Sequence, residues 1–173
     1  RNPPPVISVA GRILPEDDPA IALVGTRTAT PEGLEMAREL GKAFAEAQTT
    51  VVSGLAIGCD TALHYTIKFT SRRTIAILGS GIRVIQTLLN LALARDIFRQ
   101  GAVVSEQQPY APPTVGRLMA RNRLQSALSR GVLVVEARAQ GGSMSTARHA
   151  VEQGRRLYAV DWSEPKETAE GTR

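Results

Sequence analysis

Arginines gather in one stretch of this chain, and their side chains are suited to binding phosphate. Between Pro112 and Arg156 the sequence has eight arginines, no lysine and two glutamates, which gives this stretch a net charge of +6, whereas the whole chain carries +5. The basic character is therefore local, and a planar guanidinium can bind phosphate through two hydrogen bonds. The stretch predicts a polyanionic partner. Its arginines are Arg117, Arg121, Arg123, Arg130, Arg138, Arg148, Arg155 and Arg156.

The densest part of this stretch is residues 117–123, which contain three arginines and Asn122. If the segment is helical, Arg117 and Arg121 share one face, where like charges repel unless an anion lies between them. Asn122 lies on another face of such a helix. It either holds a loop by hydrogen bonds or contacts a nucleotide base of the polyanionic partner. Glu136 follows an apolar run and is either the internal partner of these arginines or a carboxylate of the site.

Glycine and small hydroxyl residues follow the apolar runs of the chain. In an α/β protein such turns bring backbone amides and helix N-termini together, which is the usual physical basis of an anion site. Five of them together predict a phosphate-binding rim. They are Gly25-Thr26-Arg27-Thr28, Ser53-Gly54, Gly79-Ser80-Gly81, Ser105-Glu106 and the segment 141–146.

The apolar runs are continuous rather than alternating, as expected for parallel strands that are covered on both faces. Helical patterns lie between them, so we expect an α/β fold: an extended Rossmann-like, doubly wound, mostly parallel sheet with helices on both faces, whose ligand lies at the carboxyl ends of the strands. The predicted strands are residues 20–24, 50–52, 74–78, 102–104, 132–135 and 157–160.

Three helix starts can be predicted from capping residues. The clearest helix spans residues 31–47, with Thr30 as its N-cap and proline at its first position. Asp60 is expected to cap a second helix. Thr146 or Ser145 is expected to cap a later one, which ends at Gly154.

The length of 173 residues predicts one globular domain, which we place at residues 20–162. A proline-rich extension (1–19) and a polar tail (163–173) lack periodicity, so extended or disordered segments are expected there. A single cysteine allows no internal disulfide, and two distant histidines make no zinc site. The single cysteine is typical of the reducing cytoplasm, and we expect no metal or cofactor. No apolar run approaches the roughly 18 residues of a membrane span, so we expect a soluble protein.

The common catalytic motifs are missing from the sequence. Gly79-Ser80-Gly81 begins like a dinucleotide fingerprint but has valine at the third glycine position, and no Walker lysine motif or Gly-x-Ser-x-Gly elbow occurs. Cys59 has no neighbouring base and is interpreted as a small buried residue. These patterns disfavour hydride transfer, phosphoryl transfer and serine or cysteine catalysis.

Taken in order, these blocks resemble the DNA-processing protein A family (DprA or Smf) over roughly residues 3–160. The similar segments are Val24-Gly25-Thr26-Arg27, residues 29–33, 51–60 with His64, 76–81 with Asn90, Ser105-Glu106, Arg121-Asn122-Arg123, residues 134–137, 143–146, and Ala150 with Gly154. The resemblance implies a Rossmann-like domain that binds and protects single-stranded DNA and helps to load a RecA-type recombinase during natural transformation. It also implies a homodimer without enzymatic activity.

Carried over by position, the resemblance makes Arg27, Arg121 and Arg123 a DNA-binding pocket, with Arg117 and Asn122 on the same patch. The Ser53-Gly54 and Gly79-Ser80-Gly81 turns would shape its rim. The glycine at 54 would let the backbone approach a phosphate or sugar.

Several positions depart from the family pattern. Ile57 stands where relatives usually have arginine, and Leu118 stands where an aromatic residue commonly precedes the Arg-Asn-Arg block. Gln86-Thr87 replaces a usual Tyr-Pro, and Asp161 replaces a proline. We also expect no flanking helical domains of the kind common in the family. We therefore expect weaker affinity for single strands than in the family at large, because a ring that stacks on a base contributes about 1–3 kcal/mol.

Two alternatives remain at this stage. A phosphoribohydrolase-like enzyme of the same superfamily needs a glutamate after its glycine-threonine turn, where this chain has Arg148 or His149. A nucleotide-binding sensor would use the same glycine turns but contact few phosphates, so its affinity would depend less on salt than that of a DNA-binding protein.

Overall fold

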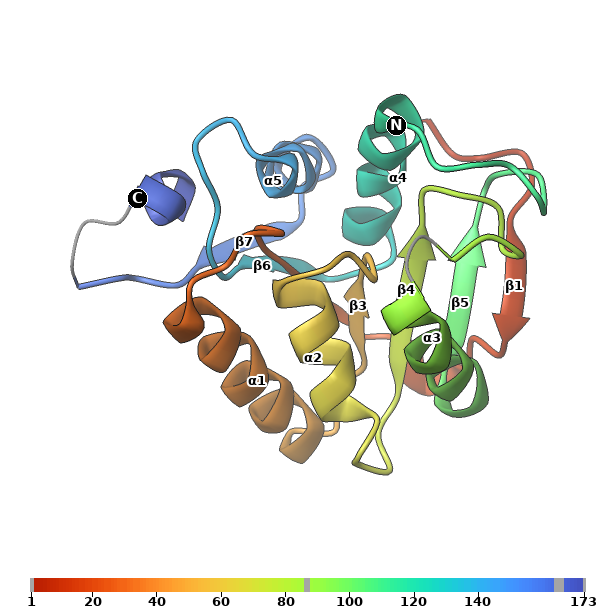
Figure 1. Cartoon of the computed structure of the whole chain (residues 1–173), viewed down its shortest axis with the longest axis horizontal. Coiled ribbons are helices and arrows are strands. Elements are labelled where there is room, and N and C mark those ends of the chain that lie inside the picture. Colours follow the sequence, from red (N-terminus) through yellow and green to blue (C-terminus); the bar gives the residue numbers. More distant parts are fainter. Residues whose placement is uncertain (1, 86–87, 164–166, 173) are drawn as a thin grey trace.

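The computed structural model describes residues 2–85, 88–163 and 167–172, which form a single α/β sandwich (Figure 1). Its strands are β1 (Ser8–Gly11), β2 (Ile21–Val24), β3 (Val51–Ser53), β4 (Thr74–Leu78), β5 (Ala102–Ser105), β6 (Gly131–Val134) and β7 (Arg156–Ala159). Its α-helices are α1 (Pro31–Glu46), α2 (Cys59–Ile67), α3 (Leu88–Gln100), α4 (Val115–Ala127) and α5 (Gly142–Glu152). Two short 3-10 helices are η1 (Pro15–Asp17) and η2 (Glu167–Thr172).

The strands make one sheet in the order β1-β5-β4-β3-β2-β6-β7. All neighbouring pairs are parallel except β1 with β5. The chain thus builds outward from β2 in one direction through β5 and then returns to place β6 on the other side of β2. This reversal of strand order leaves a crevice at the carboxyl ends of β2 and β6, where ligands of open α/β sheets bind.

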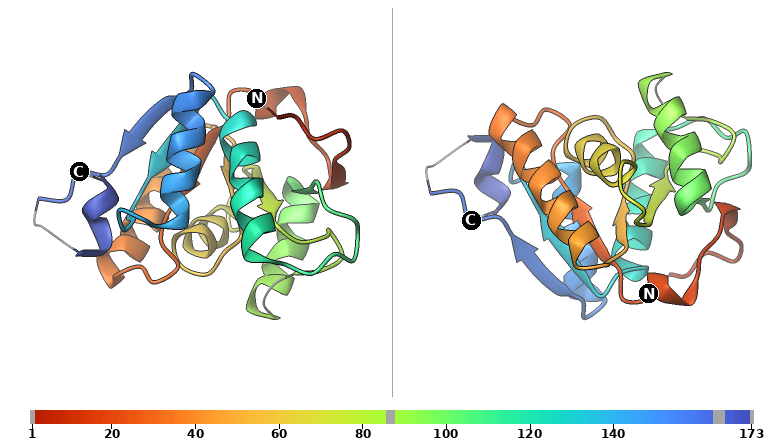
Figure 2. Two further views of the ribbon diagram at one scale, coloured as in Figure 1. Left: turned by 90° about the horizontal axis from the view of Figure 1, so that it is seen from above. Right: turned by 90° about the horizontal axis from the view of Figure 1, so that it is seen from below.

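Helices cover both faces of the sheet, as predicted. Figure 2 shows α4 and α5 on one face and α1, α2 and α3 on the other. The strand β2 serves both layers, because Ala22 and Val24 pack in the cluster with the α4 and α5 residues while Leu23 packs against α1 and α2. This burial on both sides explains why the runs are continuously apolar.

The start of α1 agrees with the sequence prediction. The Thr30 hydroxyl accepts a hydrogen bond from the Gly33 N–H (3.1 Å), and Pro31 is the first helical residue. Glu136 reinforces this cap, because its fully buried carboxylate accepts hydrogen bonds from both the Thr30 N–H and the Thr30 hydroxyl (3.1 Å each). Neither role expected for Glu136 is found: it contacts the α1 cap instead of an arginine or the pocket.

The other two capping predictions are wrong. The N-cap of α2 is Gly58, with a φ of +88° that favours glycine, and Asp60 lies inside the helix. Helix α5 begins at Gly142, three residues before Ser145, with Gly141 as its N-cap. Its predicted end is confirmed, because the helix stops at Glu152 and Gly154 follows with a φ of +67°.

The six predicted strands are found within one residue of their expected bounds. The sequence prediction missed β1, which lies in the proline-rich segment and pairs antiparallel with β5, and α3. In the tail, residues 167–172 form η2 and bury Ala169, whereas residues 164–166 and 173 lie outside the described residues. The division of the chain at residues 19 and 163 stays a prediction.

Within the described residues, no helix is long and apolar enough to cross a membrane. Three or more metal-ligating side chains do not come together anywhere in that part of the chain.

Candidate nucleic-acid interface

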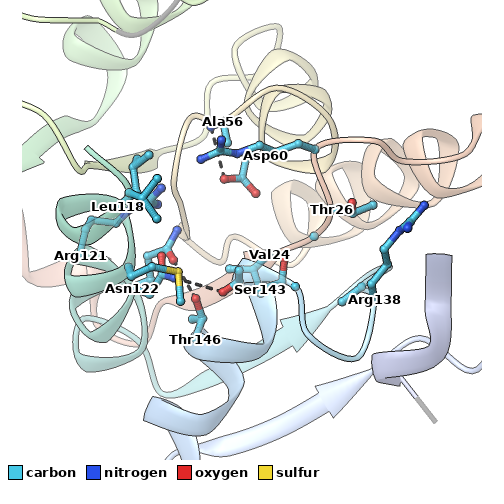
Figure 3. A pocket seen from close by; sticks show the side chains of 18 residues that line it. Val24, Thr26, Ala56, Asp60, Leu118, Arg121, Asn122, Arg138, Ser143 and Thr146 are labelled. Atoms are coloured by element: carbon cyan, nitrogen blue, oxygen red, sulfur yellow. Dashed lines mark hydrogen bonds between the residues drawn. The ribbon is translucent and has the colours of Figure 1, made fainter. Parts of the chain in front are cut away.

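A cavity of about 360 Å³ opens at the carboxyl ends of β2 and β6, at the reversal of strand order (Figure 3). Three walls meet there: the loops after β2 and β3, one face of α4, and the loop that leads into α5. The lining residues are Val24, Gly25, Thr26, Arg27, Ala56, Asp60, Val115, Leu118, Met119, Arg121, Asn122, Gln125, Ala137, Arg138, Gly141, Gly142, Ser143 and Thr146. We call this cavity the switch-point pocket.

Arg121 is the most deeply placed cation of the switch-point pocket, since only 4% of it is exposed. Burial lowers the pKa of its guanidinium to about 10, although the nearby Asp60 opposes this shift and the guanidinium remains charged at neutral pH. Its Nε has no hydrogen-bond partner within the described part of the chain. A buried cation with an unused donor is costly unless an anion compensates it, so Arg121 points to an anionic ligand.

Gly54 and Gln125 hold the Arg121 side chain in place. With the Gln125 amide oriented so that its NH2 donates to Thr146 (3.1 Å), its oxygen accepts hydrogen bonds from Arg121 Nη1 (2.6 Å) and from the Gly54 N–H (2.9 Å). A Cβ at position 54 would overlap the guanidinium. The glycine therefore makes room for Arg121, whereas the sequence prediction reserved this space for a phosphate or sugar.

Asp60 organises the loop between β3 and α2. Its carboxylate accepts hydrogen bonds from the N–H groups of Gly54 (3.1 Å) and Ala56 (3.3 Å). Burial raises the pKa of this carboxyl, and the charge of Arg121 counteracts that rise. The residue thus shapes the rim beneath Arg121.

Arg27 lies at the exposed mouth of the switch-point pocket, in the loop after β2. Glu136 O accepts a hydrogen bond from the Thr26 N–H (2.7 Å), and Thr26 O accepts one from the Cys59 N–H (3.4 Å), so the loop is held to the segment after β6 and to α2. Cys59 is buried, as predicted, and burial raises the pKa of its thiol to about 12.

The N-terminus of α5 closes the pocket on the side opposite α2. Its N-cap is Gly141, which makes no side-chain capping bond, so backbone N–H groups of the first turn are available to an anion. The Asn122 Nδ2 donates to Gly142 O (3.1 Å), which is the loop-holding alternative of the two predicted roles. Arg138 adds a cation that the sequence analysis counted but did not assign, and it pairs with Glu167 of η2 (3.1 Å).

Arg123 and Arg117 do not line the switch-point pocket. The Arg123 guanidinium binds both carboxylate oxygens of Glu106 (2.7 and 2.5 Å) and donates from Nε to Asn2 O (2.9 Å). Arg117 donates to Pro112 O (2.6 Å) just before α4. Geometry therefore separates these two arginines from Arg121.

The predicted rim residues 53 and 79–81 have structural contacts. Ser53 is fully buried and donates to Leu23 O (2.7 Å), and Ser80 donates to Val84 O (2.6 Å). Gly79 lies against the backbone of Leu118, and Gly81 lies against the 108–109 carbonyls. These turns position β3 and α4 around the pocket without lining it.

Comparisons with known proteins find relatives that match most of the chain. A family model described as DNA recombination-mediator protein A matches residues 1–173. Protein Smf of Synechocystis sp. is 35% identical over 98% of this chain and 44% of its own length, and the chain spans about half the length of the curated relatives it matches.

Two solved structures share the fold. DNA processing protein A of Streptococcus pneumoniae has a TM-score of 0.89 and 32% identity, covering 96% of this chain and 58% of that one. The Helicobacter pylori protein of that name, whose structure was described for its unique single-stranded DNA binding mode, has a TM-score of 0.89 and 28% identity, covering 99% and 78%.

Proposed function

Because the chain belongs to the DNA recombination-mediator protein A family, we propose that it binds single-stranded DNA in the switch-point pocket. The observation that carries this proposal is the buried Arg121, whose Nε has no partner in the described part of the chain and which lines the switch-point pocket together with Gly141 and Gly142 at the start of α5. A phosphate placed between them would receive charge-assisted hydrogen bonds from both. Arg27 at the mouth and Arg138 on the opposite loop would contact the neighbouring phosphates.

The proposal assigns no catalytic step to this pocket. The Asp60 carboxylate already accepts two backbone hydrogen bonds, and its place is fixed by the loop that it holds. Arg148 and His149 stand where a phosphoribohydrolase-like enzyme needs its glutamate. Protection of single strands, assistance to a RecA-type recombinase, a homodimer and a cytoplasmic location are further parts of this proposal that rest on family likeness.

The test is a titration of the protein with a labelled 20-nucleotide single strand and with its duplex at several salt concentrations. A pocket that contacts several phosphates of a flexible strand should bind the single strand more tightly, with log affinity falling by about 0.7 per contacted phosphate for each tenfold rise in salt. Preference for the duplex would contradict the proposal. A slope of log affinity against log salt that corresponds to one phosphate contact would favour a nucleotide-sensing pocket, provided that a free mononucleotide binds as tightly as the single strand.

A further inference from the structure

An aromatic pair with a lysine between its rings is exposed at the end of α2 remote from the switch-point pocket. Tyr65 is 51% exposed and Phe69 is 70% exposed, and their ring centroids lie 5.1 Å apart at 76°. Lys68 Nζ lies 4.4 Å from the Tyr65 centroid and 4.9 Å from the Phe69 centroid. Exposed rings beside a cation are the combination that single-strand-binding surfaces use to stack bases.

The exposed side of α2 joins this aromatic pair to the pocket. Ala56 lines the pocket, and after it Ile57, Thr61, Tyr65 and Phe69 follow at four-residue spacing, which puts the helical members on one face. The nine residues of α2 rise by about 13 Å, which is about four nucleotides of a stacked strand. Figure 1 shows α2 running from the end of β3 to the loop before β4, beside α3.

The charges around the aromatic pair are mostly positive. Lys68 Nζ lies 3.3 Å from Asp96 of α3, and Arg99 lies 3.8 Å from the same carboxylate. The half-buried Arg72 lies four residues after Lys68 in the chain, and its side chain has no ion pair within the described residues. Lys68 and Arg99 thus share one carboxylate and Arg72 adds a further positive charge, an excess that complements a polyanion better than an acidic or neutral protein surface.

We propose that a single strand held in the switch-point pocket continues along the exposed side of α2 and stacks its bases on Tyr65 and Phe69. Lys68 and Arg72 lie where they neutralise the adjacent phosphates. Of the stacking residues, Tyr65 lies on α2 and Phe69 follows two residues after its end, whereas the position before the Arg-Asn-Arg block holds Leu118. This inference rests on the proposed function and extends it by a second contact, remote from the pocket.

The experiment compares oligothymidylates of 4 and 20 nucleotides, of which only the longer one reaches from the pocket past the end of α2. Phe69→Ala and Tyr65→Ala should each weaken binding of the 20-mer about fivefold or more, the lower part of the range for base stacking, and leave the 4-mer unchanged. Phe69→Trp should retain the wild-type affinity for the 20-mer because it keeps a stacking surface. Phe69→Leu should bind the 20-mer more weakly, because leucine is apolar but has no ring on which a base can stack.

Phe98→Ala is the matched control. Phe98 is 50% exposed but lies two residues after Asp96, about 200° around α3 from the side that faces Lys68. Its loss should not affect either oligonucleotide, and circular dichroism of every variant confirms that it folds.

Unchanged 20-mer binding in Phe69→Ala would overturn the inference. A Phe69→Leu variant that binds the 20-mer like the wild type would also overturn it. The same holds for a Phe69→Ala variant that changes only self-association in sedimentation, because both results indicate a protein-docking surface. If the wild type binds neither oligonucleotide, the proposed function fails and this inference with it. If the wild type binds both oligonucleotides and the variants bind both with unchanged affinity, the proposed function stands and only this inference fails.

Discussion

At the scale of single residues, the site depends on how Arg121 is buried. Its guanidinium lies over Gly54, is oriented by Gln125 and shares its surroundings with the Asp60 carboxylate. A charge in this position is held before any ligand arrives, so little side-chain entropy is lost when an anion binds. Arg123 lies two residues further along the chain, but its guanidinium already forms an ion pair with Glu106.

Substitution of Gly54 by alanine should remove this arrangement without removing a charge. The added Cβ overlaps the Arg121 guanidinium, so the side chain must leave its present position. We expect the affinity for a 20-nucleotide single strand to fall about tenfold, as for the loss of one hydrogen bond to a charged group. Fluorescence anisotropy measures this affinity.

Gly116→Ala provides the matched control for this substitution. Gly116 lies near the start of α4 with no atom within 4 Å of the place of its Cβ, so alanine should leave binding unchanged there. A Gly54→Ala protein that binds as tightly as Gly116→Ala would show that the position of Arg121 does not matter for binding.

At the scale of elements, the strands and helices whose signals lie in adjacent residues of the sequence were predictable. The six parallel strands and α1 were found because burial on both faces leaves continuous apolar runs and because Thr30 and Pro31 mark a helix start. The short β1 escaped prediction because four residues in a proline-rich segment gain their strand conformation from pairing with β5.

The site was predictable only where local sequence reveals it. The glycine turns and Arg121 were identified from local sequence, and the pocket lies at the strand ends where the fold class predicts it. The ion pair of Arg123 with Glu106 could not be predicted, because the partners are 17 residues apart in the sequence and the loop between β5 and α4 must fold back to bring them together. The contribution of Arg138 likewise depends on how the loop after β6 folds back.

Helix α2 and strand β4 are joined by His64, whose imidazole Nδ1 lies 2.8 Å from the Thr74 hydroxyl oxygen. The residue is fully buried, and burial lowers its pKa from 6.5 to about 3. The folded protein therefore keeps His64 neutral while the unfolded chain binds a proton below pH 6.5. Its contribution to stability is complete above pH 6.5 and is lost as the pH falls toward 3.

The free energy of unfolding should thus decrease below pH 6.5, by up to about 1.4 kcal/mol per pH unit from this group alone. Urea denaturation at pH 7.5, 6 and 5 measures it. His64→Asn, which keeps a polar atom near the Nδ1 position but does not titrate, should show a shallower pH dependence over this range. Equal pH dependence in the two proteins would mean that His64 does not stay neutral on folding.

At the scale of the whole molecule, the cations of the site come from two loops and a helix that are far apart in the sequence. Arg27 follows β2, Arg121 lies on α4 and Arg138 follows β6, and the reversal of strand order brings all three to one cavity. The local excess of arginine in residues 112–156 therefore supplies the walls made by α4 and by the loop that leads into α5, and the fold adds Arg27 from the loop after β2. The account requires that these walls act together on one strand of DNA.

Arg27→Ala tests that claim most directly, because Arg27 is exposed, lines the mouth of the pocket and forms no ion pair in the described part of the chain. Its loss should not disturb the fold. Arg38→Ala, which removes an arginine paired with Glu35 on the solvent side of α1, is the control.

The measurement is the affinity for a 20-nucleotide single strand as a function of salt concentration in the wild type and both variants. The account predicts that Arg27→Ala binds about tenfold more weakly and that the slope of log affinity against log salt flattens by about 0.7, one phosphate contact, while Arg38→Ala matches the wild type. An Arg27→Ala protein with the affinity and slope of Arg38→Ala would contradict the assignment of the switch-point pocket to DNA.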